Sequence, residues 1–97
     1  MLLNSLLIVG ELGGWKYTDT EVLYFFESKT REGDVIRLWV RASGRLAERI
    51  SALLAQPGAR VNVRLVGRLC RLPGQHLTGE LGIHAEHIEV QPTEVTQ

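Results

Sequence analysis

The chain has 97 residues, of which 44% are hydrophobic and 23% are charged, which is typical of one small soluble globular domain. Its single cysteine, Cys70, excludes an intramolecular disulfide, and its apolar start lacks a basic leader and is too short to span a bilayer. We therefore expect a protein of a reducing cytoplasmic compartment, the bacterial cytosol or nucleoid, with an organellar stroma as the alternative.

Basic and acidic residues, eleven of each, cancel to a net charge of zero, but they are unevenly spread along the chain. Eight arginines lie between Val35 and Gly79, where Glu48 is the one acid. A surface built from this segment is expected to be locally basic, and arginine favours planar, bidentate contacts with anions. The alternative is a set of solvated strand faces without a ligand.

The first predicted strand runs from Asn4 to Leu12. It is an apolar run that we expect to be buried, with a bulge or bend at Gly10. Two glycines at 13–14 then break the pattern before a short stretch at 15–18.

The second predicted strand runs from Glu21 to Thr30 and is rich in aromatic and β-branched residues. We place Tyr24 and Phe26 on its core face and Phe25 on its outer face, with the opposite phase as the alternative. Residues 31–34 predict a hairpin connection into the next strand.

The third predicted strand, Val35 to Ser43, has two distinct faces because side chains alternate along a strand. One face is an apolar row that is expected to be buried: Ile36, Leu38, Val40 and Ala42. The other presents a cation, an indole and a cation to solvent: Arg37, Trp39 and Arg41. Single-stranded nucleic acid suits such a face, since bases stack on aromatic rings and guanidinium groups meet phosphates. The alternative is a solvated strand face whose tryptophan lies in an interface with another protein.

A helix is predicted from Ser43, as its N-cap, to Ala55, because apolar residues recur there at helical spacing. Pro57 and Gly58 end it. The fourth strand, Arg60 to Leu72, is expected to carry a bulge at Gly67, and the fifth runs from His76 to Val90.

Three strands, one helix and two strands, in that order, predict an all-β domain with one helix, the five-stranded OB-fold barrel (β-β-β-α-β-β). A glycine partway along the first strand is what this barrel needs in order to curl. The predicted domain spans residues 1–91, and residues 92–97 form a short polar C-terminal tail.

Five segments of the chain resemble the bacterial single-stranded-DNA-binding proteins and their dimeric relatives, the primosomal replication proteins of the PriB type. They are NSLLIVGEL at 4–12, WKYT at 15–18, SGRLAE at 43–48, GRL at 67–69 and IHAEHIEV at 83–90. Their order along the chain also matches. The resemblance implies an OB-fold that binds single-stranded DNA, as an accessory factor in DNA replication or replication restart.

The resemblance further implies a homodimer formed through the sheet edge that includes the first strand, with a tetramer as the alternative. Apolar residues in and before that strand (Leu2, Leu3 and Leu6) favour it too. The chain departs from the family in three respects. The loop between its second and third predicted strands is shortened to a tight turn. Arg37 stands where the family has a stacking tryptophan. An acidic C-terminal tail that recruits partner proteins is not expected.

The candidate nucleic-acid-binding residues are Trp39, Arg37, Arg41, Arg64, Phe25, Arg60 and Lys29. Their expected ligand is single-stranded DNA, with RNA as the alternative, and replication proteins are candidate partners. The competing hypothesis is an OB-fold adaptor in which the same face binds protein and nucleic-acid binding is weak or lost.

Catalysis, metals and cofactors are not expected. His84 and His87 are three apart in a strand and point to opposite faces, and neither they nor His76 has an acid or cysteine at ligand spacing. Cys70 lies in mid-strand without a nucleophile's partners.

Overall fold

A computed structural model describes residues 4–17, 22–72 and 80–91 of the chain. It contains the five strands and one helix that the sequence predicts, in the predicted order: β1 Leu6–Tyr17, β2 Val22–Lys29, β3 Val35–Arg41, α1 Gly44–Leu53, β4 Val61–Leu72 and β5 Glu80–Val90. The part of the fifth strand predicted at 76–79, residues Leu2 and Leu3, and the tail at 92–97 lie outside the described residues.

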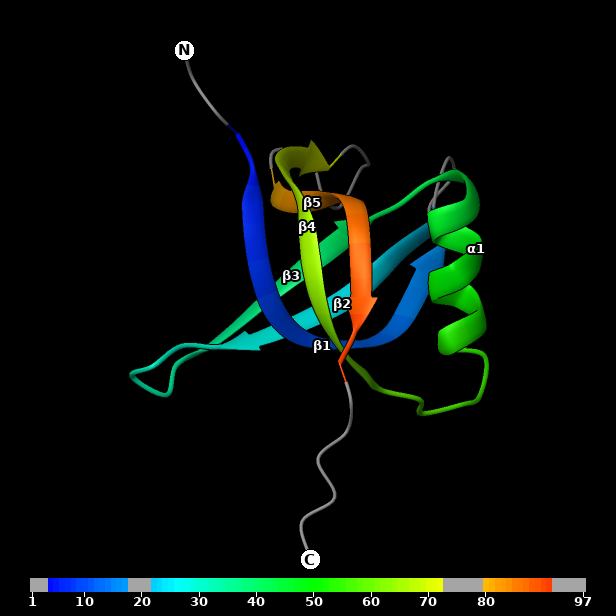
Figure 1. Cartoon of the computed structure of the whole chain (residues 1–97), viewed down its shortest axis with the longest axis horizontal. Helices are drawn as coiled ribbons and strands as arrows, with labels where there is room; N and C mark the ends of the chain where they lie inside the picture. Colours follow the sequence, from blue (N-terminus) through cyan, green and yellow to red (C-terminus); the bar gives the residue numbers. More distant parts are fainter. Residues whose placement is uncertain (1–3, 18–21, 73–79, 92–97) are drawn as a thin grey trace, which may run out of the picture.

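The strands close into a barrel in the order β1-β2-β3-β5-β4 (Figure 1). Neighbouring strands are antiparallel, except that β3 and β5 run parallel where they meet through Val40–Ile83 and Arg41–His84. Together with the helix between β3 and β4, this topology is the predicted OB-fold. Within the described residues, no helix has the length and apolar composition needed to cross a membrane.

Strand β1 belongs to both sides of the barrel. Its first part, Leu6 to Leu12, pairs with β4, and its second part, Glu11 to Tyr17, pairs with β2. The predicted break at residues 13–14 is wrong, because one strand continues through it as a bulge between Leu12 and Trp15. Gly14 has a φ of 86°, which a glycine adopts without strain.

Two glycines mark where strands come too close for a side chain. A Cβ on Gly10 would lie 2.4 Å from the Glu27 carbonyl oxygen, so the predicted glycine position is where β1 curls against β2. Its register with β4 is unbroken, so it forms no bulge there. The predicted bulge at Gly67 is confirmed by a register shift between Val66 and Gly67 against β5.

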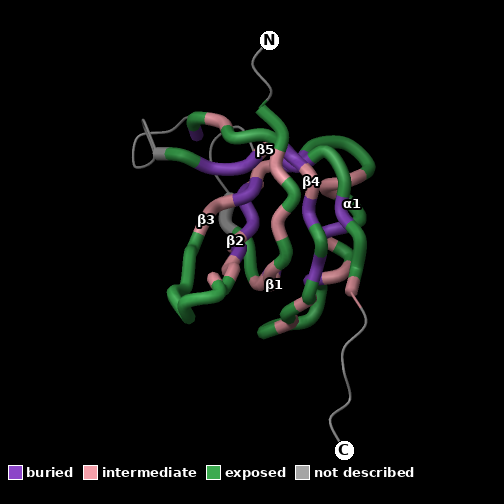
Figure 2. The backbone as a smooth tube through the Cα atoms, turned by 60° about the vertical axis from the view of Figure 1, so that its left-hand side comes forward, coloured by how far each residue is buried: buried purple, intermediate pink, exposed green. Residues whose placement is uncertain are grey.

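The core fills the barrel and is closed at one end by α1 (Figures 1 and 2). Tyr24 and Phe26 are fully buried in it, as predicted, together with Ile50 from the helix. The Tyr24 hydroxyl contacts the helix directly, donating to the Ala47 carbonyl oxygen at 3.0 Å and lying 2.8 Å from the Ser51 hydroxyl. A polar tip on a buried ring therefore attaches the helix to β2.

The predicted N-cap position of Ser43 is confirmed, whereas the predicted burial of Ile36 is wrong. Ser43 occupies the N-cap position with extended backbone, but its side chain makes no capping hydrogen bond. Ile36 was expected in the buried row, yet it is 42% exposed. The reason is that the hairpin of β2 and β3 projects beyond the barrel (Figure 1), so its tip has no core to face.

Candidate nucleic-acid interface

The outer face of β2 and β3 carries an aromatic pair. Phe25 and Trp39 are direct cross-strand partners, with ring centroids 5.5 Å apart and planes inclined at 71°. This edge-to-face arrangement is a favoured one for aromatic rings. Because Tyr24 and Phe26 occupy the core, the predicted outward phase of Phe25 is confirmed.

Trp39 is half-buried rather than open to solvent, which corrects the prediction of a fully exposed row. It packs with Cys70 against a second apolar cluster, formed outside the main core by Leu23 and Leu72. Gly82 permits this packing, since a Cβ there would lie 2.7 Å from the Leu72 side chain and 2.8 Å from the Trp39 carbonyl oxygen. The last residues of β4 and the first residues of β5 therefore lie against β3 and cover one side of the indole.

Arg37 and Arg41 flank Trp39 on the same face of β3, as predicted, but each is engaged. The exposed Arg37 donates from Nε to Glu27 at 3.0 Å, across the hairpin. Arg41 is partly buried and donates from Nε to Nδ1 of His84 at 3.2 Å. The structure thus brings Phe25, Arg37, Trp39 and Arg41 together into one surface, which we call the aromatic face.

Acids from the flanking segments meet the arginines of the middle segment in space. Besides Arg37–Glu27, Arg60 pairs with Glu11 at 2.8 Å and Arg68 with Glu86 at 3.6 Å. The hydrogen bond to Glu11 and then its charge raise the pKa of Arg60. The locally basic surface expected from the sequence is therefore partly neutralised, although solvent-exposed pairs of this kind add little stability.

The remaining predicted residues lie away from the aromatic face. Arg64 is exposed on β4, where its register partners are Val9 and Glu89, so β1 stands between it and β2. Lys29 is exposed at the end of β2, next to the turn at the tip of the projecting hairpin. Arg60 precedes β4, beyond the helix.

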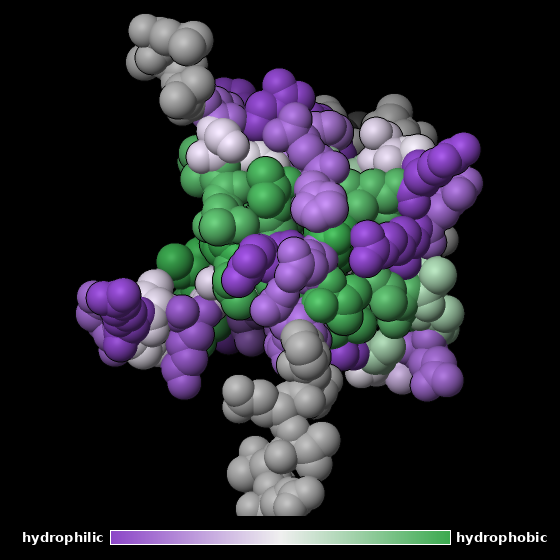
Figure 3. Space-filling model, in the orientation of Figure 1, coloured by the Kyte–Doolittle hydropathy of each residue, from purple (hydrophilic) through white to green (hydrophobic). Residues whose placement is uncertain are grey.

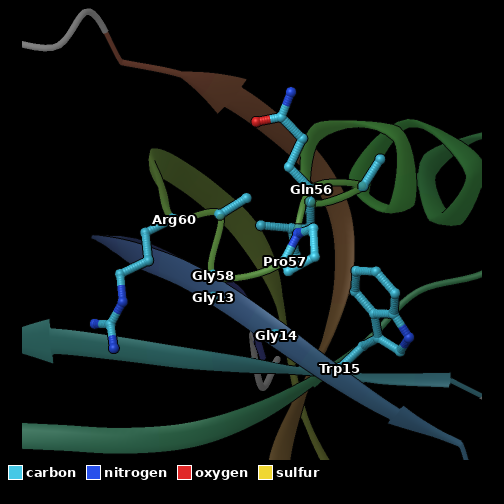
Figure 4. A pocket seen from close by; sticks show the side chains of 10 residues that line it. Gly13, Gly14, Trp15, Gln56, Pro57, Gly58 and Arg60 are labelled. Carbon is cyan, nitrogen blue, oxygen red and sulfur yellow. The ribbon is translucent and has the colours of Figure 1, made fainter.

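An open groove of about 430 Å³ lies beside Arg60, between the β1 bulge and the segment that follows α1. Trp15 lines it and is 39% exposed. Figure 4 shows the Trp15 and Arg60 side chains at opposite ends of this groove, directed away from each other. Trp15 is not among the candidate residues predicted from the sequence. The feature that could have indicated it is its position directly after two glycines. The two side chains do not converge on one ligand.

Comparison with known proteins shows the fold. No family model and no curated protein matches the chain. Among solved structures, a small single-stranded DNA binding protein from Mycoplasma pneumoniae is 16% identical, covers 97% of this chain and 100% of its own, and superposes with a TM-score of 0.66. A small single-stranded DNA-binding protein from Streptomyces coelicolor is 21% identical over 94% of this chain and 96% of its own, with a TM-score of 0.65. The second such protein from Mycobacterium smegmatis is 20% identical over 97% and 98%, with a TM-score of 0.60. At these identities the likeness establishes the barrel over nearly its whole length.

Proposed function

We propose that the chain is a non-catalytic module that binds single-stranded DNA through the aromatic face. The observation that carries this proposal is the Phe25–Trp39 pair with an arginine on either side along β3. The similar barrels described above are named as single-stranded DNA-binding proteins, which supports the same ligand class here. A cytoplasmic accessory role in DNA replication or replication restart is the setting that we propose for it.

In this mechanism a base stacks on the indole of Trp39, and guanidinium groups contact the phosphates on either side. Each base stacked on an aromatic ring contributes about 1–3 kcal/mol without sequence preference. Arg37 must exchange its contact with Glu27 for a phosphate, which reduces its net contribution. Zero net charge also removes long-range attraction, so we expect micromolar or weaker affinity.

The test is binding of a fluorescent oligo(dT) followed by anisotropy at low salt. Trp39→Ala should weaken binding about tenfold or more, since it removes a stacking platform. Trp15→Ala is the matched control, because it removes the chain's other indole, which lines the groove beside Arg60 and is not part of the aromatic face. Thermal melting confirms that each variant folds. Equal binding by Trp39→Ala and the parent would contradict the proposal.

A second candidate function is the OB-fold adaptor, and one observation favours it. Hydrophobic surface gathers over β1 (Figure 3), where Leu7 is 64% and Val9 54% exposed. Exposed apolar residues that are neighbours on one sheet face are typical of protein interfaces. If the parent chain binds no oligo(dT) at low salt, the adaptor function replaces the first proposal.

We propose a second copy of the chain as the occupant of this β1 face. Leu7 lies opposite Val66 on β4. The next row on the same face of the sheet, two residues along, places Val9, Arg64 and Glu89 side by side across β1, β4 and β5. Neighbouring opposite charges beside an apolar row suit a twofold interface, in which Arg64 of one copy meets Glu89 of the other. Light scattering at tens of micromolar should give a dimer mass, and Leu7→Glu should give a monomer. A monomeric parent would contradict this, and a tetramer would add a second interface.

A further inference from the structure

A small pocket of about 200 Å³ adjoins the aromatic face at the junction of β3, β4 and β5. It is lined by Asn4, Arg41, Arg68, Leu69, Cys70 and His84. Arg41 is the register partner of His84 across the parallel β3–β5 pair, and His84 is in turn the partner of Arg68 across β5 and β4. Three nitrogen-bearing side chains thus form one row across three strands, which we call the Arg–His–Arg row.

The hydrogen bonds in the pocket define its chemistry. Arg41 Nε donates to Nδ1 of His84, so the other ring nitrogen, Nε2, is the one that can donate a hydrogen bond. The Asn4 side chain is occupied by the Leu69 backbone, donating to its carbonyl oxygen and accepting from its N–H, each at 3.0 Å. Among the described residues that line the pocket there is no carboxylate.

Arg41 on β3 and Arg68 on β4 lie on either side of His84 on β5, so the row places two positive charges on one face of the sheet. Glu86 pairs with Arg68 at 3.6 Å but is not among the residues that line the pocket. A site of this composition offers an anion two guanidinium groups and an imidazole N–H, which are the donors that bind phosphate best.

We infer that the Arg–His–Arg row binds one phosphate group of the single-stranded DNA backbone, an inference that rests on the proposed function. Arg41 follows Trp39 by two residues on the same face of β3, a separation of about 7 Å along a strand. Cys70 connects the two places, since it packs in the cluster with Trp39 and also lines the pocket. A base on Trp39 therefore brings a neighbouring phosphate to the row. Beyond Trp39 the DNA strand then continues from β3 toward β5 and β4.

The first experiment measures how oligo(dT) affinity depends on salt concentration. Arg68→Gln should weaken binding and reduce the slope of log K against log salt by about 0.7, the value for one lost contact to a single strand. Arg68→Lys should retain the slope because it keeps the charge. Arg45→Gln, on the exposed face of α1, removes the same charge outside the pocket and should leave the slope unchanged. Equal slopes for Arg68→Gln and Arg45→Gln would overturn the inference.

The second experiment separates this inference from the proposed function by using inorganic phosphate as the probe, with the imidazole signals followed by NMR. Phosphate should shift the His84 signals at concentrations where chloride of equal ionic strength does not. The signals of His87, which is exposed on β5, should stay unmoved. Shifts of both histidines or of neither would show that the row is not an anion site, whether or not DNA binds. A parent that fails to bind oligo(dT) but shows the His84 shift would retain the anion site and refute the proposed function.

Discussion

Gly10→Ala tests the physical basis of the barrel's closure. The added methyl carbon would lie 2.4 Å from the Glu27 carbonyl oxygen and 2.6 Å from the Phe26 ring. Short C···O contacts in proteins lie at about 3.3 Å, so β1 and β2 must separate by roughly 0.9 Å at this point. Glu27 is held by pairing with both β1 and β3, which leaves its backbone little freedom to move.

Overpacking of this kind costs about 1–3 kcal/mol, and contact with backbone places this site at the upper end. A loss of about 3 kcal/mol lowers the melting temperature of a domain this size by roughly 12–24 °C. Gly13→Ala is the matched control in the same strand, because the nearest atom to its new methyl is the flexible Arg60 Cγ at 3.2 Å. Thermal unfolding followed by circular dichroism measures both variants. Equal melting temperatures for the two would refute the account of how β1 curls.

Two further predictions concern the helix attachment and the aromatic face. Tyr24→Phe removes the hydroxyl that contacts Ala47 and Ser51, so it should cost about 1 kcal/mol and lower the melting temperature by roughly 4–8 °C; an unchanged melting temperature would show that this contact does not hold the helix. Glu27→Gln should tighten oligo(dT) binding because it releases Arg37 and removes a negative charge beside Phe25, whereas Arg37→Gln should weaken it. Anisotropy titrations compare the two, and changes in the same direction would contradict the role given to Arg37.

Alternation and periodicity were enough to predict the local structure around the site. The period of two placed Tyr24 and Phe26 inside and Phe25 outside, and the helical spacing placed Ile50 in the core. These patterns are local, since each depends on residues within one strand or one helix. The order of the elements then determined the barrel, because few small folds share it.

Features that depend on contacts between distant segments could not be predicted in this way. Trp39 is half-buried by Leu72, from a strand beyond the helix. Arg60 finds its acid in β1, at Glu11, so charge counted along the chain overestimated the basic surface. His84 joined the candidate site only because β3 and β5 meet in parallel opposite Arg41, a pairing that no local pattern reveals.

The central claim is that Trp39 touches the nucleic acid, and a single-indole variant tests it most directly. Trp15→Phe leaves Trp39 as the chain's one tryptophan, so the intrinsic fluorescence then reports on the aromatic face alone. Titration with poly(dT) at two salt concentrations should quench this emission, more strongly at the lower salt because phosphate contacts release counterions. Emission that stays constant while a labelled oligo(dT) binds the same variant would place the DNA elsewhere and contradict the account.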